Sequence, residues 1–183
     1  MWLLKRKRSV GINNNNMTEA EKIIKSLQLQ PHPEGGFFKE TYRSQGTINV
    51  DSLGEDFSEK RNYSTCIYFL LTSDNFSAFH RIKQDEIWHF YKGSPIKLHV
   101  ISEEGIYKKI IIGNNLEKGE LPQCVVKAKQ YFAAEVININ DFTLVGCTVA
   151  PGFDFNDFEL PKRNQLVSKF PQYQSEINRL TNH

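Results

Sequence analysis

The sequence has few cysteines, no long apolar run and almost no net charge for its 183 residues. Its three cysteines, Cys66, Cys124 and Cys147, are far apart and form no Cys-x-x-Cys pair. This pattern argues against a disulfide framework and a thiolate zinc site, and it favours a reducing compartment. Because no apolar run is long enough to cross a bilayer, we expect a cytoplasmic protein without a membrane partner.

The basic residues are distributed unevenly. The formal net charge is +2, but the run Lys5-Arg6-Lys7-Arg8 lies in a first segment without acidic residues. Without this run, 19 basic residues stand against 21 acidic ones, so the rest of the chain is mildly acidic. Such a chain lacks the basic surface typical of proteins that bind nucleic acid, and we expect no nucleic-acid partner.

Residues 1–16 differ in composition from the rest of the chain. The basic run is followed by four consecutive asparagines at 13–16, which offer little to bury. This composition predicts a disordered tail, while a nuclear or organellar targeting role of the basic run stays open. The remaining residues, 17–183, have the length of one domain. Deleting residues 1–16 is therefore expected to leave the melting temperature nearly unchanged.

Short β-strands dominate the middle of the chain. Their regular spacing and the Gly, Asn and Pro residues between them predict an antiparallel sandwich or barrel. A Thr-x-x-Glu capping box at Thr18 predicts a short helix before the strands, and two short helices are expected near residues 162–170 and 172–180. The fold class is therefore all-β with short flanking helices. The predicted strands are 37–43, 64–72, 76–81, 86–92, 96–102, 107–112, 123–126, 131–137 and 142–150. The polar segment 44–61 is read as a long loop in which one more short strand at 47–50 stays open.

The stretch from Phe79 to Gly93 brings candidate catalytic groups together. His80 ends one predicted strand and Glu86 begins the next, so both side chains can reach one pocket wall. A neighbouring carboxylate such as Glu86 would orient His80 and favour its protonated form, giving a pKa near neutrality. The alternative is a hydrogen-bonded pair without a catalytic role, since buried polar groups must be paired in any case.

These motifs together resemble the Cupin_5 family of the cupin superfamily. The resemblance is carried by His32-Pro33-Glu34-Gly35-Gly36 and the residues up to 44, and by residues 65–71, 80–93 and 145–155. It implies an antiparallel, RmlC-like jelly-roll β-barrel with a ligand-sized cavity, assembled as a homodimer. Related cupins include nucleotide-sugar epimerases, sugar isomerases and storage proteins, which leaves the activity open.

Metal-binding cupins hold one ion with two His separated by one residue, then a Glu and a distant His. In this chain His80 and Glu86 keep the first and third positions, but Ile82 occupies the second and Phe132 the last. Two ligands do not hold a divalent ion tightly. The sequence therefore predicts no metal ligands and no cofactor, with a bound metal as the weaker alternative.

Four further residues are candidate ligand-binding groups. Glu40, Tyr42 and Arg43 form a polar cluster on the strand at 37–43, and Trp88 follows Glu86 on the same predicted face. Arg43 either clamps a phosphate or carboxylate, or forms an ion pair with Glu40 or with an acidic residue across the dimer interface. Trp88 either stacks on a ligand ring or belongs to the core.

Three functions are compatible with this pattern. The first is binding of a small polar, sugar-like molecule, with isomerisation or epimerisation by His80 as acid and base, assisted by Glu86. The second is a non-catalytic ligand-binding or storage-type barrel. The third is a metal-dependent enzyme with a rearranged site.

Overall fold

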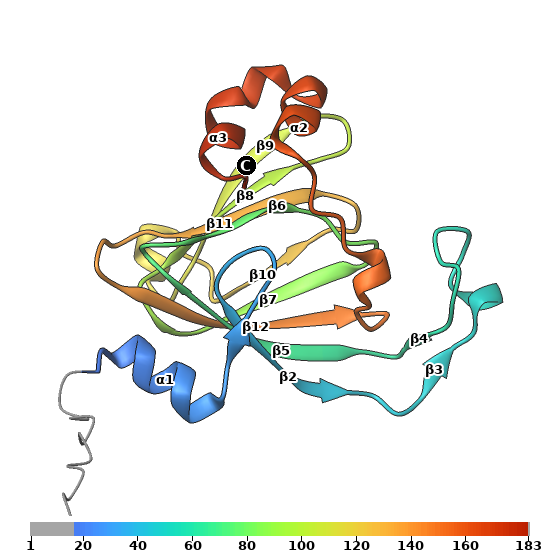
Figure 1. The fold of residues 1–183 in the computed structure, drawn as a ribbon, viewed down its shortest axis with the longest axis horizontal. Helices are drawn as coiled ribbons and strands as arrows, with labels where there is room; N and C mark the ends of the chain where they lie inside the picture. The colour runs from blue at the N-terminus through green and yellow to red at the C-terminus, as the bar shows by residue number, and fades with distance from the viewer. Residues whose placement is uncertain (1–16, 183) are drawn as a thin grey trace, which may run out of the picture.

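The computed structural model describes residues 17–182, so the predicted tail at 1–16 lies outside the described residues. Two antiparallel sheets face each other, and a two-stranded pair, β3-β4, projects from one end (Figure 1). The larger sheet has the order β1-β2-β5-β12-β7-β10, and the smaller has the order β6-β11-β8-β9. The strands are β1 (Gln30–Pro31), β2 (Phe37–Arg43), β3 (Thr47–Ile48), β4 (Arg61–Asn62), β5 (Thr65–Thr72), β6 (Phe76–His80), β7 (Asp85–Gly93), β8 (Ile96–Ile101), β9 (Tyr107–Ile112), β10 (Gln123–Val126), β11 (Tyr131–Val136) and β12 (Phe142–Ala150).

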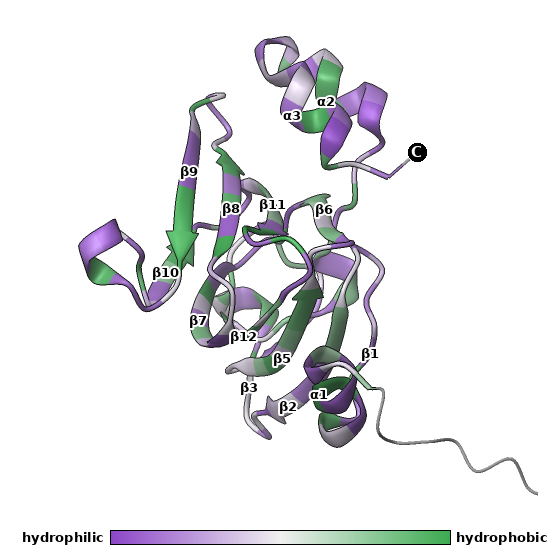
Figure 2. Cartoon of the chain, turned by 90° about the vertical axis from the view of Figure 1, so that its left-hand side faces the viewer, coloured by the Kyte–Doolittle hydropathy of each residue, from purple (hydrophilic) through white to green (hydrophobic). Residues whose placement is uncertain are grey.

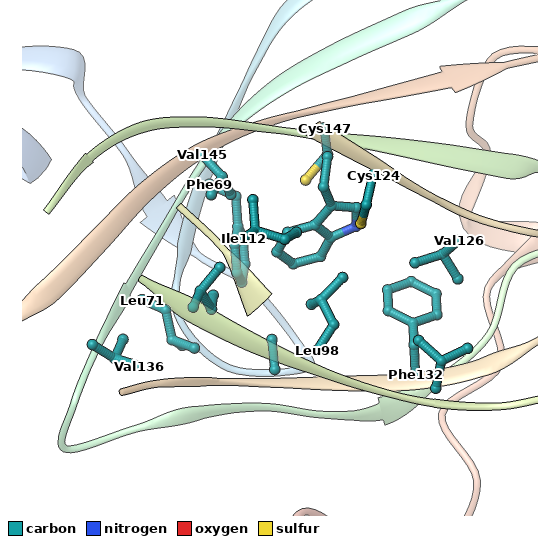
Figure 3. Packing of buried hydrophobic residues seen from close by; sticks show 14 residues of the cluster. Phe69, Leu71, Leu98, Ile112, Cys124, Val126, Phe132, Val136, Val145 and Cys147 are labelled. Atoms are coloured by element: carbon teal, nitrogen blue, oxygen red, sulfur yellow. The ribbon is translucent and has the colours of Figure 1, made fainter. Parts of the chain in front are cut away.

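The main core fills the space between the two sheets. Each strand places every second side chain inward, and these inner positions are mostly aliphatic or aromatic. Figure 3 shows Phe69, Leu71, Leu98 and Phe132 among the buried side chains that meet there from both sheets. Each such side chain contributes about 1.5–3 kcal/mol when it is fully buried.

Three short α-helices flank the sandwich. The helix α1 (Glu19–Leu27) begins at the predicted Thr18 capping box and packs near Leu70 and Phe142. The helices α2 (Arg163–Lys169) and α3 (Gln174–Arg179) cover the smaller sheet with apolar side chains, and Figure 2 shows the hydrophobic band of α2. No helix within residues 17–182 is long and apolar enough to cross a membrane. Short 3-10 helices lie at Val50–Ser52, Leu116–Lys118, Phe155–Asp157 and Pro171–Tyr173.

The predicted fold class is confirmed. All nine predicted strands are present with ends within one residue of the prediction, and the two C-terminal helices lie where they were expected. The short strands β1 and β4 were not predicted, because a two-residue strand carries no alternation. The main difference is a β-bulge in β2, between Glu40 and Tyr42, which changes the composition of the site described below.

Candidate functional site

A cavity of about 240 Å³ lies against the inner face of the larger sheet. Strands β2, β5, β7 and β12 supply its wall, and the end of β6 contributes His80. Two irregular segments close it: residues 32–34, which precede β2, and residues 153–158, which follow β12. His80 and Glu86 therefore face the same cavity, as their positions around the β6–β7 turn suggested.

The carboxylate that contacts His80 is Glu34 and not Glu86. Oε2 of Glu34 lies 3.0 Å from Nε2 of His80, and the Ser77 hydroxyl donates a 2.8 Å hydrogen bond to Oε1 of Glu34. The expectation that Glu86 orients His80 directly was wrong. Glu34 reaches this position because the backbone of its loop is joined to β6, where the amide of Ala78 donates to the Glu34 carbonyl at 2.8 Å.

The glycine pair after Glu34 permits this close approach. Gly35 and Gly36 have φ angles of 115° and 70°, a region that other residues rarely adopt. A Cβ atom at Gly35 would lie 2.1 Å from the carbonyl oxygen of Phe76, so a side chain there would push the loop off β6. The His-Pro-Glu-Gly-Gly motif thus has a structural reason, which is to hold Glu34 against Ser77 and His80.

One proton lies between Oε2 of Glu34 and Nε2 of His80, and either group can carry it. Nδ1 of His80 lies 2.7 Å from the Ala78 carbonyl, which can only accept, so this nitrogen carries a hydrogen and Nε2 of a neutral ring is an acceptor. Burial raises the pKa of Glu34 well above its usual value, and the nearby Glu86 raises it further. Burial lowers the pKa of His80, so the expectation of titration near neutrality was wrong. Both shifts favour a neutral pair, in which a protonated Glu34 donates to His80.

Glu86 is a buried carboxyl group that has no ion-pair partner among the residues that the structure describes. Its side chain is inward on β7, and the residue is 8% exposed. Burial raises its pKa to about 7, although the Cys147 thiol and the Trp88 indole act in the opposite direction. The Trp88 N–H is itself buried without a hydrogen bond of normal geometry among residues 17–182. A pKa of about 7 makes Glu86 a cavity group suited to exchanging a proton near neutral pH.

The bulge in β2 decides which polar residues of that strand reach the cavity. Glu40 pairs with Ile67 and Tyr42 with Cys66, so Thr41 is the extra residue and the alternation of faces shifts by one. Glu40 and Arg43 therefore line the cavity, while Tyr42 is 54% exposed and is not among the lining residues. Placing Tyr42 with the ligand-binding residues was wrong for this reason.

Arg43 is held by protein acceptors. Its Nε and Nη2 donate to the two carboxylate oxygens of Glu40 at 2.9 and 2.7 Å, and Nη1 donates to Asn62. Nη2 also contacts the Phe153 carbonyl at 3.2 Å. Of the two alternatives for Arg43, the structure has the ion pair with Glu40. Trp88 belongs to the core cluster, as one of its two alternatives expected. It also borders the cavity, so contact with a ligand stays a prediction.

The segment that follows β12 closes the cavity with aromatic rings. Phe153, Phe155 and Phe158 contact one another with ring centroids 5.0 to 6.4 Å apart. A buried ion pair fixes this segment, because Arg61 donates two 2.7 Å hydrogen bonds to Asp157. The sequence analysis did not assign residues 153–158 to the site. The Pro-Gly-Phe-Asp-Phe run after the last strand is the sequence feature that could have indicated them.

The donor set at this site does not fit a divalent metal ion. Ile82 and Phe132 are buried apolar residues, and both ring nitrogens of His80 are engaged by Ala78 and Glu34. Within residues 17–182 no three His, Cys, Asp or Glu side chains are placed to hold a metal ion. A metal site needs three or more protein ligands with accessible lone pairs.

Comparison with known proteins gives the family. The sequence profile of Cupin_5, described as Cupin superfamily (DUF985), matches residues 21–161. A Saccharomyces cerevisiae protein, described as Uncharacterized protein YML079W, is 33% identical over 146 residues, covering 75% of this chain and 72% of the yeast protein.

Solved structures show the same relationship. A hypothetical protein from Leishmania major is 36% identical, with a TM-score of 0.80 over 90% of this chain and 99% of that chain. Protein SO0799 from Shewanella oneidensis is also 36% identical, with a TM-score of 0.82 over 91% and 99%. An oxalate decarboxylase from Bacillus subtilis shares the fold at 15% identity and a TM-score of 0.50, with 82% of this chain matched to 36% of that one. The chain belongs to the Cupin_5 family of the cupin superfamily.

Proposed function

We propose that this cupin binds a small molecule in its barrel cavity and moves a proton on that molecule, as in an isomerisation or epimerisation. The observation that carries the proposal is Glu86, a buried carboxyl group that faces the cavity with a pKa of about 7. A general acid or base works best when its pKa lies near the working pH. Burial without a counter-charge, at a cavity wall, is the arrangement that produces such a group.

The geometry favours Glu86 over His80 as the group that exchanges the proton. Both nitrogens of His80 are occupied, one by the Ala78 carbonyl and the other by Glu34. His80 has no lone pair left for a substrate, so the direct acid–base role expected for it is replaced by a positioning role. His80 and Ser77 fix Glu34, and the nearby Glu86 helps to keep the Glu34 carboxyl group protonated by raising its pKa.

A non-catalytic binding or storage role is the second candidate. It is favoured by the complete internal pairing of Glu34, since both of its carboxyl oxygens have protein partners. A closed set of this kind stabilises the barrel whether or not chemistry takes place. The sugar-like character of the ligand and the homodimer stay predictions.

The test has two steps. A thermal-shift screen of small metabolites first identifies compounds that stabilise the wild-type protein, with Glu86→Gln as the matched variant for the cavity and Tyr42→Phe as a control outside it. The bound compound is then incubated with protein in D₂O, and its carbon-bound hydrogens are followed by NMR. Catalysis predicts deuterium incorporation by the wild type and none by Glu86→Gln. Stabilisation without incorporation supports the storage-type role, and the lack of any stabilising compound contradicts both.

A further inference from the structure

The charges that line the cavity determine which ligands it accepts. The lining residues contain one arginine, Arg43, and its guanidinium is already paired with both carboxylate oxygens of Glu40. The two lining histidines, His32 and His80, have pKa values lowered by burial, to about 4 for His32, so both are uncharged at neutral pH. An anionic ligand would therefore meet no uncompensated positive charge among the lining residues. Burying such an anion is costly.

The acidic residues of the cavity are not all paired with basic residues. Within residues 17–182 Glu86 has no ion-pair partner. Asp154 differs from it, because Asp154 lies near Arg43 and Arg61 and helps to raise the pKa of both. The titratable groups near Glu86 come from three neighbouring elements: Glu34 before β2, Cys124 on β10 and Cys147 on β12. Burial raises the pKa of each, and neither a carboxyl group nor a thiol can supply positive charge in either protonation state.

The apolar part of the wall consists largely of aromatic rings. Ring faces carry partial negative charge and attract organic cations placed over them. Within residues 17–182, the cation–π contacts lie on Phe57, Tyr107, Tyr131 and Phe170, so no Lys or Arg side chain of the described chain occupies the rings of the cavity. The imidazole of His32, which burial keeps neutral, packs against four of these rings, so a cation would add to rings that a neutral group already contacts. We call these rings the aromatic collar; it comprises Phe38, Phe69, Phe153, Phe155 and Phe158.

We propose that the cavity selects small organic ammonium compounds, with the nitrogen against Glu86 and an apolar body inside the aromatic collar. This inference rests on the proposed binding of a small molecule and names its class. The aromatic collar supplies cation–π attraction, and an ionised Glu86 supplies a charge-assisted hydrogen bond. Polar groups elsewhere in the wall are largely paired with one another, so a ligand with many hydroxyl groups would leave most of them without partners.

Ammonium binding and the ionisation of Glu86 are coupled. A cation binds the carboxylate form, so binding releases a proton wherever the free protein has Glu86 protonated. With a pKa of about 7 for Glu86, the affinity for the cation should rise about tenfold between pH 6 and pH 8. Binding of a neutral ligand of the same shape does not require Glu86 to be ionised, so the affinity for that ligand should stay constant between pH 6 and pH 8.

Three probes of nearly identical shape and different charge test the inference: benzylammonium, benzyl alcohol and benzoate. Isothermal titration calorimetry at pH 8 is expected to rank benzylammonium at least tenfold tighter than benzyl alcohol, with benzoate weakest. The matched variant Glu86→Gln keeps the shape of the side chain and removes its charge. It should lose the preference for benzylammonium while keeping the affinity for benzyl alcohol.

The outcomes separate this inference from the proposed function. Equal or tighter binding of benzyl alcohol or benzoate overturns the ammonium class and leaves small-molecule binding intact. A preference for benzylammonium that persists in Glu86→Gln places the cation elsewhere and also overturns it. Binding of none of the three probes overturns the ammonium class, while the proposed binding of a small molecule is decided separately by the metabolite screen. The pH dependence in the wild type needs no variant, so poor folding of Glu86→Gln does not remove the test.

Discussion

Replacing Glu34 by glutamine tests where the proton between Glu34 and His80 lies. If Glu34 is protonated, the amide nitrogen of the introduced side chain can donate to Nε2 of His80 while its carbonyl oxygen accepts from Ser77. Both hydrogen bonds are then kept, and the free energy of unfolding should fall by less than about 1 kcal/mol. If the pair were a salt bridge, the substitution would leave a buried imidazolium without a counter-charge, at a cost of about 3–5 kcal/mol.

The variant Glu34→Ala provides the reference for complete loss. It removes the partners of two buried groups, the Ser77 hydroxyl and Nε2 of His80, each costing about 1–2 kcal/mol when left unpaired. We therefore expect a loss of about 2–4 kcal/mol. Urea unfolding at pH 7, followed by tryptophan fluorescence, gives the free energies of the wild type and both variants under one condition. A Glu34→Gln loss as large as that of Glu34→Ala would refute the neutral pair.

Two further predictions concern Glu86 and Arg61. The folded-state pKa of Glu86, about 7, lies above its usual 4.5, so the folded protein holds an extra proton between these values. Its stabilising contribution is complete below about pH 4.5 and falls by about 3 kcal/mol as the pH rises to 7. Glu86→Gln should therefore match the wild type at low pH and exceed it at pH 8 in unfolding free energy; a constant difference would contradict this. Arg61→Met removes both Arg61 hydrogen bonds from the buried Asp157 and leaves it with Lys83 and Gln84. The variant should therefore cost less in chemical unfolding than the about 3–5 kcal/mol of a completely unpaired buried charge. The double variant Arg61→Met, Asp157→Leu should recover most of this loss, and its failure to do so would count against the ion pair as the cause.

The fold could be predicted because strand signals are local. Alternating side chains and Gly, Asn or Pro turns determine strand ends, and strands such as Tyr107–Ile112 and Phe142–Ala150 have the predicted bounds. The inward positions of His80 and Glu86 follow from the same alternation and the turn between them. The family resemblance supplied the jelly-roll barrel into which these strands assemble.

The site was less predictable because its decisive groups depend on non-local contacts. Glu34 lies in an irregular loop, and only its packing on β6 brings it to His80. The bulge at Thr41 exchanges Tyr42 for Arg43 on the cavity face, and nothing in the strand pattern marks an extra residue. The aromatic segment 153–158 has no periodicity, so its place over the cavity depends on the distant Arg61.

The central claim is that Glu86 is a buried carboxyl group that exchanges its proton near neutral pH. An NMR titration of protein labelled with ¹³C at the glutamate side-chain carboxyl carbon measures this directly, with Glu86→Gln identifying the resonance. The claim predicts a midpoint near pH 7 for Glu86 in the ligand-free protein. A midpoint near pH 4.5, the usual value for a glutamate, would mean that the carboxyl group is solvated or paired, and it would contradict the proposed chemistry.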